Sequence, residues 1–541
     1  MQKVLIKRID HLGIVAGTIR DLGIIKLIDE LLGIDKNETI TSGEAIAGMI
    51  INGLGFVDSP LMLTPQFFEH KALNLLIGPN VTPDDFNRHK LGRVLDKASA
   101  YGTEKLFGQV ASAVCQVAGV DTKIVHADTT TFSLDGAYDQ ESDTTSLHVT
   151  HGHSKDMRPD LKQVVQEVVV SQDGGIPLMA KTWSGNASDT IILRERAKMI
   201  TDGLIDSKIQ CLIADAKLYA QKTAAFLNKI KFITRVPSTL KLESETIICA
   251  LAQNAAWVIS TDNKYKLQEF TSDNFAINNQ RWIVVYSTHA RDRAVKTMAK
   301  IVNKALGLIE KELFHLRVTS FSCEDDAAKS LATIAKKFPY HTITRSALKT
   351  KIKYLQRGRP SIDAKQELEY QIEALVSQND AAIQQEINQR SCFVLATNAS
   401  PEKVDMHVVL FHYKQQDTVE KSFAFLKSPE FFASSLYLKK PERIDGLLMV
   451  MVLALLVYSL AQRKLRAILK EKNLFIPNQI KQPTQRPTLR WIMQCFEGIN
   501  YVEITINNAK TIVIDGISDL RCRIIELFGG AVQEIYQNSA A

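Results

Sequence analysis

Cysteine is scarce in this 541-residue chain, and its spacing excludes several kinds of site. The seven cysteines are scattered, odd in number and never arranged as a Cys-x-x-Cys pair. Neither a disulfide framework nor a thiolate zinc site is therefore expected, and a reducing cytosol is the compartment that fits best. The N-terminus lacks the sustained apolar stretch of a secretory signal, so we expect no leader peptide.

Long hydrophobic runs are also nearly absent. The one that stands out, Gly446–Tyr458, is shorter than the roughly 18–20 residues that a membrane span requires. Charged residues flank it closely, at Arg443, Asp445, Arg463 and Lys464. We therefore expect a helix buried against a sheet, and no membrane association.

Charge of one sign is in only modest excess, with a net charge of +7. The cations gather in two segments. Arg345–Arg359 holds six Lys or Arg residues and no acid, and Arg463–Arg490 holds eight with one acid. Each segment is a candidate for contact with phosphates, although a solvated surface face would have the same composition.

The apolar pattern predicts two kinds of structure along the chain. Residues 1–118 have apolar spacings of three and four with glycines between the segments, which is typical of helices. From about residue 120 short β-branched runs follow, in the order three strands, helix, strand, helix, strand. This is the order of an RNase H-like sheet, so we expect a mixed α/β core after an all-helical domain.

The later part of the chain predicts an insertion into that core. Two strand-end acids, Asp128 and Asp215, are followed by a third candidate acid, Glu420, 205 residues further on. That gap is too long for one loop, so we expect an inserted α+β domain with a helical arm. Its expected helices include Ala290–Leu316 and Ala364–Asn388. The predicted divisions are 1–118, 119–237, 238–391 (the insertion), 392–498 (core with the basic segment) and 499–541, the last serving dimer contact or packing.

These acids form the main chemical hypothesis. Asp128 and Asp215 each end an apolar run, and Glu420 lies in a predicted helix. Carboxylates at strand ends and on a helix can meet at one edge of a sheet, where they repel one another until divalent cations neutralise them. An all-oxygen set suits Mg²⁺. The alternative is three unrelated acids.

The predicted helix of Glu420 carries further candidates. Tyr413, Gln416, Glu420 and Lys427 follow one another at spacings of three, four and seven, which places them on one helical face. Such a face would bind metal through Glu420, phosphates through Lys427 and a base against Tyr413.

Other segments offer weaker signals for DNA contact. The histidines of His148–His153 could suggest zinc, but no cysteines accompany them, and we favour a polar loop in which Lys155, Arg158 and Lys162 face DNA. His126 should share a sheet face with Asp128 and is either packed or catalytic.

Two further candidates are an arginine motif and a tryptophan. Arg357-Gly-Arg359-Pro matches the core of an AT-hook, which places arginines in a narrow minor groove, although an exposed turn would look the same. Trp183 is either a base-stacking wedge or a core residue that ends a strand.

The segment Tyr413–Lys427 resembles the Tyr-x2-Arg-x3-Glu-x6-Lys signature of one branch of the insertion-sequence DDE transposases. It departs from that signature at Gln416, where Lys414 or Lys421 could supply the missing charge, or where one phosphate contact is weaker. Further segments similar to the same branch are Ala127–Phe132, Gly152–Gln163, Gly185–Asp189, Ala214–Tyr219 and Lys481–Thr488.

The resemblance implies a cut-and-paste DNA transposase with an RNase H-like core and an N-terminal domain that binds transposon ends. It also implies a homodimer on double-stranded DNA, with the element's terminal inverted repeats and target DNA as partners. Two Mg²⁺ ions, replaceable by Mn²⁺, would lie about 3.5–4 Å apart, with Asp128 shared and Asp215 and Glu420 completing one site each. The alternatives are a nuclease of this fold that does not join DNA, and a non-catalytic DNA-binding protein.

Overall fold

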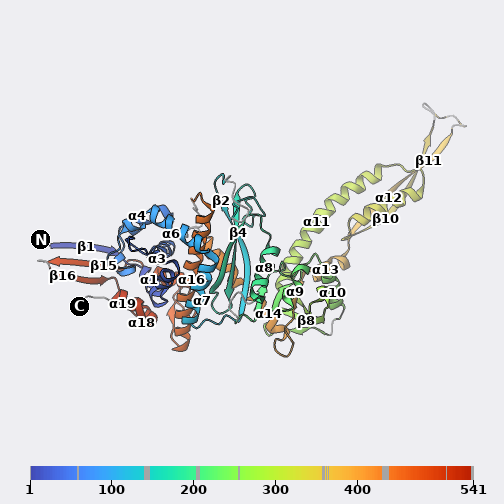
Figure 1. The fold of residues 1–541 in the computed structure, drawn as a ribbon. Helices are drawn as coiled ribbons and strands as arrows, with labels where there is room; N and C mark the ends of the chain where they lie inside the picture. Colours follow the sequence, from blue (N-terminus) through green and yellow to red (C-terminus); the bar gives the residue numbers. More distant parts are fainter. Residues whose placement is uncertain are drawn as a thin grey trace. The chain divides into compact units, whose positions relative to one another are not determined.

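The structure is a computed structural model that describes residues 2–57, 60–138, 147–202, 208–253, 256–355, 360, 362, 365–428, 438–506 and 509–537. Its secondary structure is mixed α/β, as the sequence predicts (Figure 1). The chain divides into two compact units. The first unit comprises Met1–Thr234, Phe275–Asn278 and Phe411–Ala541, and the second comprises Arg235–Asn274 and Asn279–Leu410.

A mixed sheet forms the centre of the first unit. Its strands are β2 (Ile124–Leu134), β3 (Lys162–Ser171), β4 (Pro177–Ser184), β5 (Cys211–Ala214) and β6 (Lys231–Arg235). They lie in the order β4-β3-β2-β5-β6. The β2–β5 and β5–β6 pairs are parallel, and the β2–β3 and β3–β4 pairs are antiparallel. A helix, α8 (Asp189–Thr201), connects β4 to β5, while only the short η3 (Gln221–Thr223) and α9 (Ala224–Leu227) precede β6.

The N-terminal region is helical over most of its length. Its elements are α1 (Leu12–Asp21), α2 (Ile24–Leu32), α3 (Ser42–Gly53), η1 (Leu61–Leu63), α4 (Thr64–Phe68), α5 (Leu73–Leu76), η2 (Pro83–Phe86), α6 (Arg88–Tyr101) and α7 (Thr103–Val117). The prediction of an all-helical domain was wrong at its start, where Gln2–Arg8 forms the strand β1. It pairs with β15 (Asn500–Ile506), which pairs in turn with β16 (Ala509–Asp515). Because its partner comes from the other end of the chain, no local pattern shows this strand.

The longest apolar helix lies in the core of the first unit. α16 (Pro441–Glu471) packs against α3, α6, α7 and β4. Its most apolar window has a mean hydropathy of 2.3, enough to cross a membrane by composition, but 89% of that window is buried inside the protein. The prediction of a helix buried against a sheet is confirmed, because its apolar surface is already covered by protein. The shorter α17 (Leu489–Cys495), α18 (Asp519–Phe528) and α19 (Gly530–Gln537) complete this unit.

The second unit combines four antiparallel strands with helices. Its strands lie in the order β12 (Cys392–Thr397), β9 (Arg281–Ser287), β8 (Tyr265–Thr271) and β7 (Val258–Ile259). The helices are α10 (Lys241–Ala252), α11 (Thr288–Val318), α12 (Glu324–Lys337) and α13 (Asp380–Arg390). α11 packs against α13 through Met298, Val302 and Ile387.

A long hairpin belongs to the same unit and corrects a prediction. β10 (His341–Tyr354) pairs with β11 (Gln366–Gln378), and α11 and α12 pack against β11. The sequence predicts a helix over Ala364–Asn388, yet its first half is β11. Residues such as Glu and Gln favour a helix locally, but pairing with β10 and burial of Ile372 override that preference.

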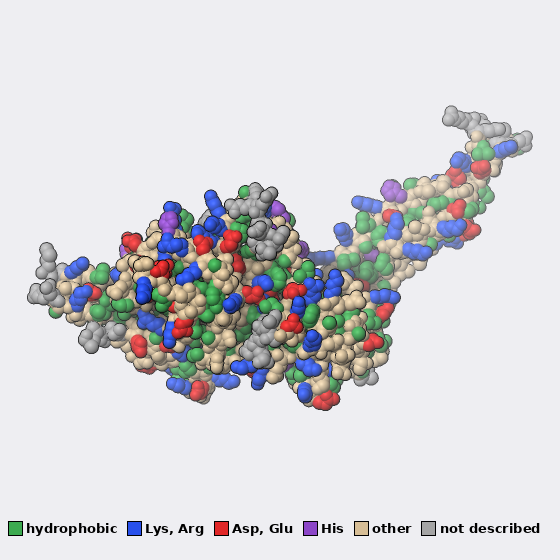
Figure 2. Space-filling view, viewed as in Figure 1, with side chains coloured by type: hydrophobic (Ala, Val, Ile, Leu, Met, Phe, Trp, Pro, Cys, Tyr) green, Lys and Arg blue, Asp and Glu red, His purple; other side chains and the backbone are tan. Residues whose placement is uncertain are grey.

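The hairpin also changes the expected role of its basic segment. Arg345 pairs with Glu324 at 2.5 Å, Lys349 with Glu373 at 2.6 Å, and Lys353 with Glu369 at 2.7 Å. Figure 2 shows blue and red side chains interspersed over these elements. Most of the described cations of this segment are therefore neutralised within the protein.

Candidate active site

The register of two parallel strands brings Asp128 and Asp215 together. Ala127 of β2 pairs with Ala214, the last residue of β5, and Asp128 and Asp215 are the next residues along the chain. The prediction that Asp128 ends a strand was wrong, because β2 continues to Leu134 through its pairing with β3. At Asp128, β2 continues while the neighbouring strand β5 ends. The end of β5 leaves space for a pocket beside β2.

Glu420 reaches the same pocket from α15 (Asp417–Leu426), which packs against β2, β3 and α16. The turn between β3 and β4 permits a close approach: a side chain at Gly175, which has a φ of +67°, would come within 2.4 Å of Thr418 on α15. The pocket has a volume of about 510 Å³. Its lining residues are Asp128, Thr129, Thr130, Lys155, Asp215, Tyr413, Gln416, Glu420, Phe423, Ala424 and Lys427.

The single helix predicted over Tyr413–Lys427 was wrong. The structure has α14 (Met406–Lys414) and then α15, with Gln416 at the N-cap of α15 and Lys427 at its C-cap. The break between the helices falls at the polar residues Gln415 and Gln416. There the backbone N–H of Gln416 donates a hydrogen bond of 3.1 Å to the backbone carbonyl of Tyr413. Tyr413, Gln416, Glu420 and Lys427 nevertheless all line the pocket.

Lys155 places a positive charge among the carboxylates. Its ammonium donates to the Thr129 backbone oxygen at 2.7 Å and hydroxyl at 2.6 Å, and lies 3.2 Å from Asp189. The Thr129 hydroxyl in turn donates to Asp189 at 2.6 Å. Asp189, in the first turn of α8, therefore holds Lys155 in position. The sequence stretch Gly185–Asp189 is the signal that could have identified it, although only as a segment similar to the family.

Electrostatics distinguish the two strand aspartates from ordinary surface acids. Burial raises the pKa of Asp128 to about 6, with repulsion from Asp215 and Asp189 adding to the rise and Lys155 opposing it. Burial also raises the pKa of Asp215, and Asp189 again adds to the effect. Both carboxylates are thus short of compensating positive charge.

The donor set is chemically suited to a hard divalent cation such as Mg²⁺. Asp128, Asp215 and Glu420 line the pocket, and no described His or Cys does, so the charged ligands available are carboxylate oxygens. Burial and the repulsion between the two aspartates destabilise their ionised forms. Among the residues that the structure describes, no three His, Cys, Asp or Glu side chains form a ready metal-binding group. The carboxylates are thus the kind of ligand that Mg²⁺ prefers. To bind one ion jointly, their side chains would have to turn toward one another.

Lys427, proposed as a phosphate contact, has an acidic partner. Its ammonium donates to Asp156 at 2.5 Å and lies 5.9 Å from the centre of the Phe132 ring. It lines the pocket beside Glu420, so a bound phosphate would compete with Asp156 for this charge.

Arg158, Lys162 and Trp183 do not line the pocket. Arg158 is ion-paired with Asp160 at 2.8 Å, and Lys162 donates to the Ala137 backbone oxygen. The Trp183 indole is partly buried and donates to Glu167 at 2.9 Å. Arg357 and Arg359 are outside the described residues.

His126 is fully buried within β2. It contacts Gln172 at 3.4 Å, and burial lowers its pKa to about 4. It does not line the pocket. Its environment is that of a packed strand residue.

Comparison with known proteins gives two matching families. Residues 123–457, more than half of the chain, match the family described as "Transposase DDE domain". Residues 4–112 match a "Domain of unknown function (DUF4277)". No curated protein matches. A solved piggyBac transposase synaptic complex with hairpin DNA is 7% identical, with 91% of this chain and 82% of that chain covered, but its TM-score of 0.33 is too low to support an inference. The family match over residues 123–457 shows that the chain belongs to the DDE transposase domain family.

Proposed function

We propose that this protein is a DNA transposase that cleaves at the ends of its own element and joins them to target DNA. The observation that carries the proposal is the convergence of Asp128, Asp215 and Glu420 on one pocket. They come from neighbouring positions on two strands and from a helix far along the chain, all within the matched residues 123–457. The strand order β4-β3-β2-β5-β6 supports an RNase H-like core, interrupted by an insertion that corresponds largely to the second unit.

The protein's own residues would perform several tasks in this reaction. Asp128, Asp215 and Glu420 would hold divalent cations, and Lys155 would limit the repulsion between the carboxylates before they bind. Two Mg²⁺ ions, when bound, would activate the attacking oxygen and stabilise the leaving oxygen of a phosphodiester. Tyr413, Gln416 and Lys427 line the same pocket and would contact the DNA strand.

Several finer features belong to the same proposal. Cut-and-paste transfer requires two element ends to be held together, so we propose a homodimer on double-stranded DNA. Arg158, Lys162, Trp183, Arg357 and Arg359 stay candidates for DNA contact. The signature branch is supported by the segment Tyr413–Lys427, with Gln416 as its departure.

The test uses DNA that carries the inverted repeats flanking the coding frame. We expect nicking that depends on Mg²⁺ or Mn²⁺ and falls to background in Asp128→Asn. Asp202→Asn is the matched control, because Asp202 is exposed at the C-cap of α8 and outside the pocket. Nicking that persists in Asp128→Asn would overturn the assignment.

A second assay separates the alternatives. Purified protein is given a pre-cut end with a free 3′-hydroxyl and a supercoiled target. Joined product supports a transposase, whereas nicking without joining would favour a nuclease of the same fold. Binding to the ends without either reaction would favour a non-catalytic protein.

A further inference from the structure

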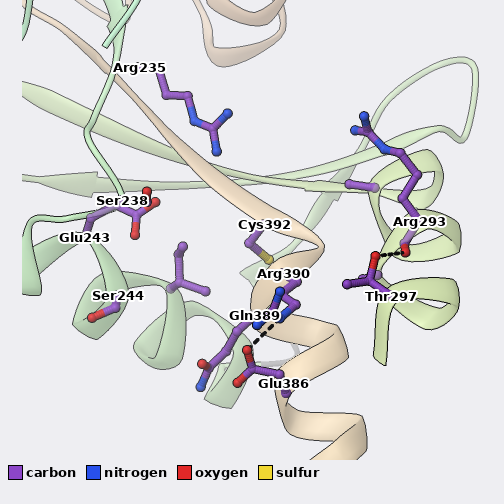
Figure 3. Close-up of a pocket in the computed structure, with 13 residues that line it drawn as sticks. Arg235, Ser238, Glu243, Ser244, Arg293, Thr297, Glu386, Gln389, Arg390 and Cys392 are labelled. Carbon is purple, nitrogen blue, oxygen red and sulfur yellow. Dashed lines mark hydrogen bonds and ion pairs between the residues drawn. The ribbon is translucent and has the colours of Figure 1, made fainter. Parts of the chain in front are cut away.

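A second pocket, of about 630 Å³, lies entirely within the second unit. Figure 3 shows side chains from β6, α10, α11, α13 and β12 around it. Three arginines line it, Arg235, Arg293 and Arg390, together with the acids Glu243 and Glu386. The expected catalytic residues do not include any of these, and the first unit's pocket does not share them.

Glu243 is the residue that marks this pocket as a binding site. It is only 4% exposed, and its carboxylate extends from α10 toward the interior of the pocket (Figure 3). Among the described residues, none forms a hydrogen bond or an ion pair with that carboxylate. Burial raises the pKa of Glu243 to about 7, since Arg235 offsets only part of the cost of removing the charge from water. Leaving a buried carboxylate without donors is costly, so a ligand that donates hydrogen bonds to it would be stabilised there.

The arginines give the pocket a net positive charge. Arg390 is paired with Glu386 at 2.6 Å. Arg235 lies over the Phe393 ring at 5.3 Å from its centre, which orients its guanidinium. Arg293 is exposed on α11 and forms no ion pair with any described residue. The lining thus carries three arginines against two glutamates, which favours a ligand that carries an anionic group as well as hydrogen-bond donors.

We propose that this pocket binds a guanine nucleotide unit, with the base edge on Glu243 and the phosphate on Arg235 and Arg293. Because the pKa of Glu243 is about 7, the binding test is run at about pH 8, where the carboxylate is mostly ionised. An ionised carboxylate offers two acceptor oxygens and no donor. Guanine presents two adjacent donors, N1–H and the N2 amino group, so both can be accepted at once. Adenine, cytosine and thymine each present a single donor group on that edge, so none of them can donate from two adjacent groups. The proposal rests on the proposed function in one respect, because DNA handled by this protein would be the source of the nucleotide.

The test measures fluorescence anisotropy of short labelled single strands with the full chain, in a chelator and without divalent ions. One strand has a single guanine in a thymine tract, and the matched strand has hypoxanthine, which lacks only the N2 amino group. Loss of a hydrogen bond to a charged group should weaken binding about tenfold or more. In Glu243→Gln the two strands should bind equally well.

Matched variants control for charge and folding. Glu245→Gln makes the same change on an exposed residue of α10 that pairs with Lys241, and it should retain the discrimination. Arg293→Ala should weaken the binding of both strands alike. Arg291→Ala, at an exposed residue of α11 that does not line the pocket, should not. Equal binding of guanine and hypoxanthine by the unaltered protein, or discrimination that survives in Glu243→Gln, would overturn the proposal.

Competitors identify the source of the nucleotide. If free deoxyguanosine monophosphate competes better than deoxyinosine monophosphate, the pocket binds guanine and its ligand is a free nucleotide. If guanine is preferred over hypoxanthine only within strands, the pocket binds guanine and its ligand is DNA. If inorganic phosphate displaces both strands fully at the same concentration, the pocket binds anions without recognising the base. That result would overturn the proposed contact between guanine and Glu243. Because no cleavage is measured, failure here leaves the nicking assay to judge the proposed function separately.

Discussion

Asp128 and Asp215 follow directly after the paired residues Ala127 and Ala214, so two parallel strands deliver their carboxylates to one pocket. Parallel pairing places residues of equal position side by side, which is why the two acids need no loop to bring them together. Their closeness has an electrostatic consequence, since Asp215 adds to the rise in the pKa of Asp128.

Replacement of Lys155 by Ala should shift the pH dependence of metal-supported nicking. Lys155 lowers the pKa of Asp128 from the value that burial alone would produce. Without that charge the folded-state pKa rises further, so the ionised form is reached only at higher pH. The acid limb of the rate profile, measured on both sides of pH 6, should therefore move upward in pH. Lys123→Ala, on an exposed residue, should leave the profile in place, and an unshifted profile in Lys155→Ala would contradict the account.

Replacement of Gln416 by Arg should strengthen DNA binding through an added phosphate contact. Gln416 lines the pocket at the N-cap of α15, where the related signature has arginine. Each new phosphate contact steepens the dependence of log K on log salt by about 0.9. The measurement is a salt titration of affinity for duplex DNA. Gln415→Arg is the control because Gln415 does not line the pocket, and an equal gain in both variants would show a general charge effect.

Replacement of Glu167 by Ala should strongly destabilise the first unit. Glu167 is fully buried in β3 and accepts two bonds from Arg196, at 2.7 and 3.0 Å, and one from Trp183 at 2.9 Å. Removing it leaves the buried Arg196 without its main partner, which should lower the free energy of unfolding by about 3–5 kcal/mol. The change is measured by urea unfolding. Glu195→Ala, in a half-buried pair with Arg194, should cost at most about 1 kcal/mol. A similarly small effect at Glu167 would refute the role of this network.

The parts of the fold that follow from local pattern were predictable. The succession of three strands, a helix and a further strand along the first unit and the buried helix around Gly446–Tyr458 both depend on periodicity and apolar content. The parts decided by distant partners were not. β1 pairs with a strand near the other end of the chain, and β11 has a composition that favours a helix by itself.

The candidate site shows the same division. Asp128, Asp215 and Glu420 could be selected because acids after apolar runs and on a patterned helix are visible in the sequence. The break between α14 and α15 was not visible, since Gln415 and Gln416 are compatible with a helix interior. Nor could spacing show that Asp189 holds Lys155, or that Asp156 pairs with Lys427, because both contacts form between separate segments of the fold.

Binding of Mn²⁺, followed by electron paramagnetic resonance, tests whether Asp128, Asp215 and Glu420 together form a metal site. We expect about two bound ions, with affinity sharply reduced in Asp128→Asn, Asp215→Asn and Glu420→Gln and unchanged in the control Asp202→Asn. Mn²⁺ affinity that is the same in all four variants as in the unaltered protein would show that these three residues do not form the metal site.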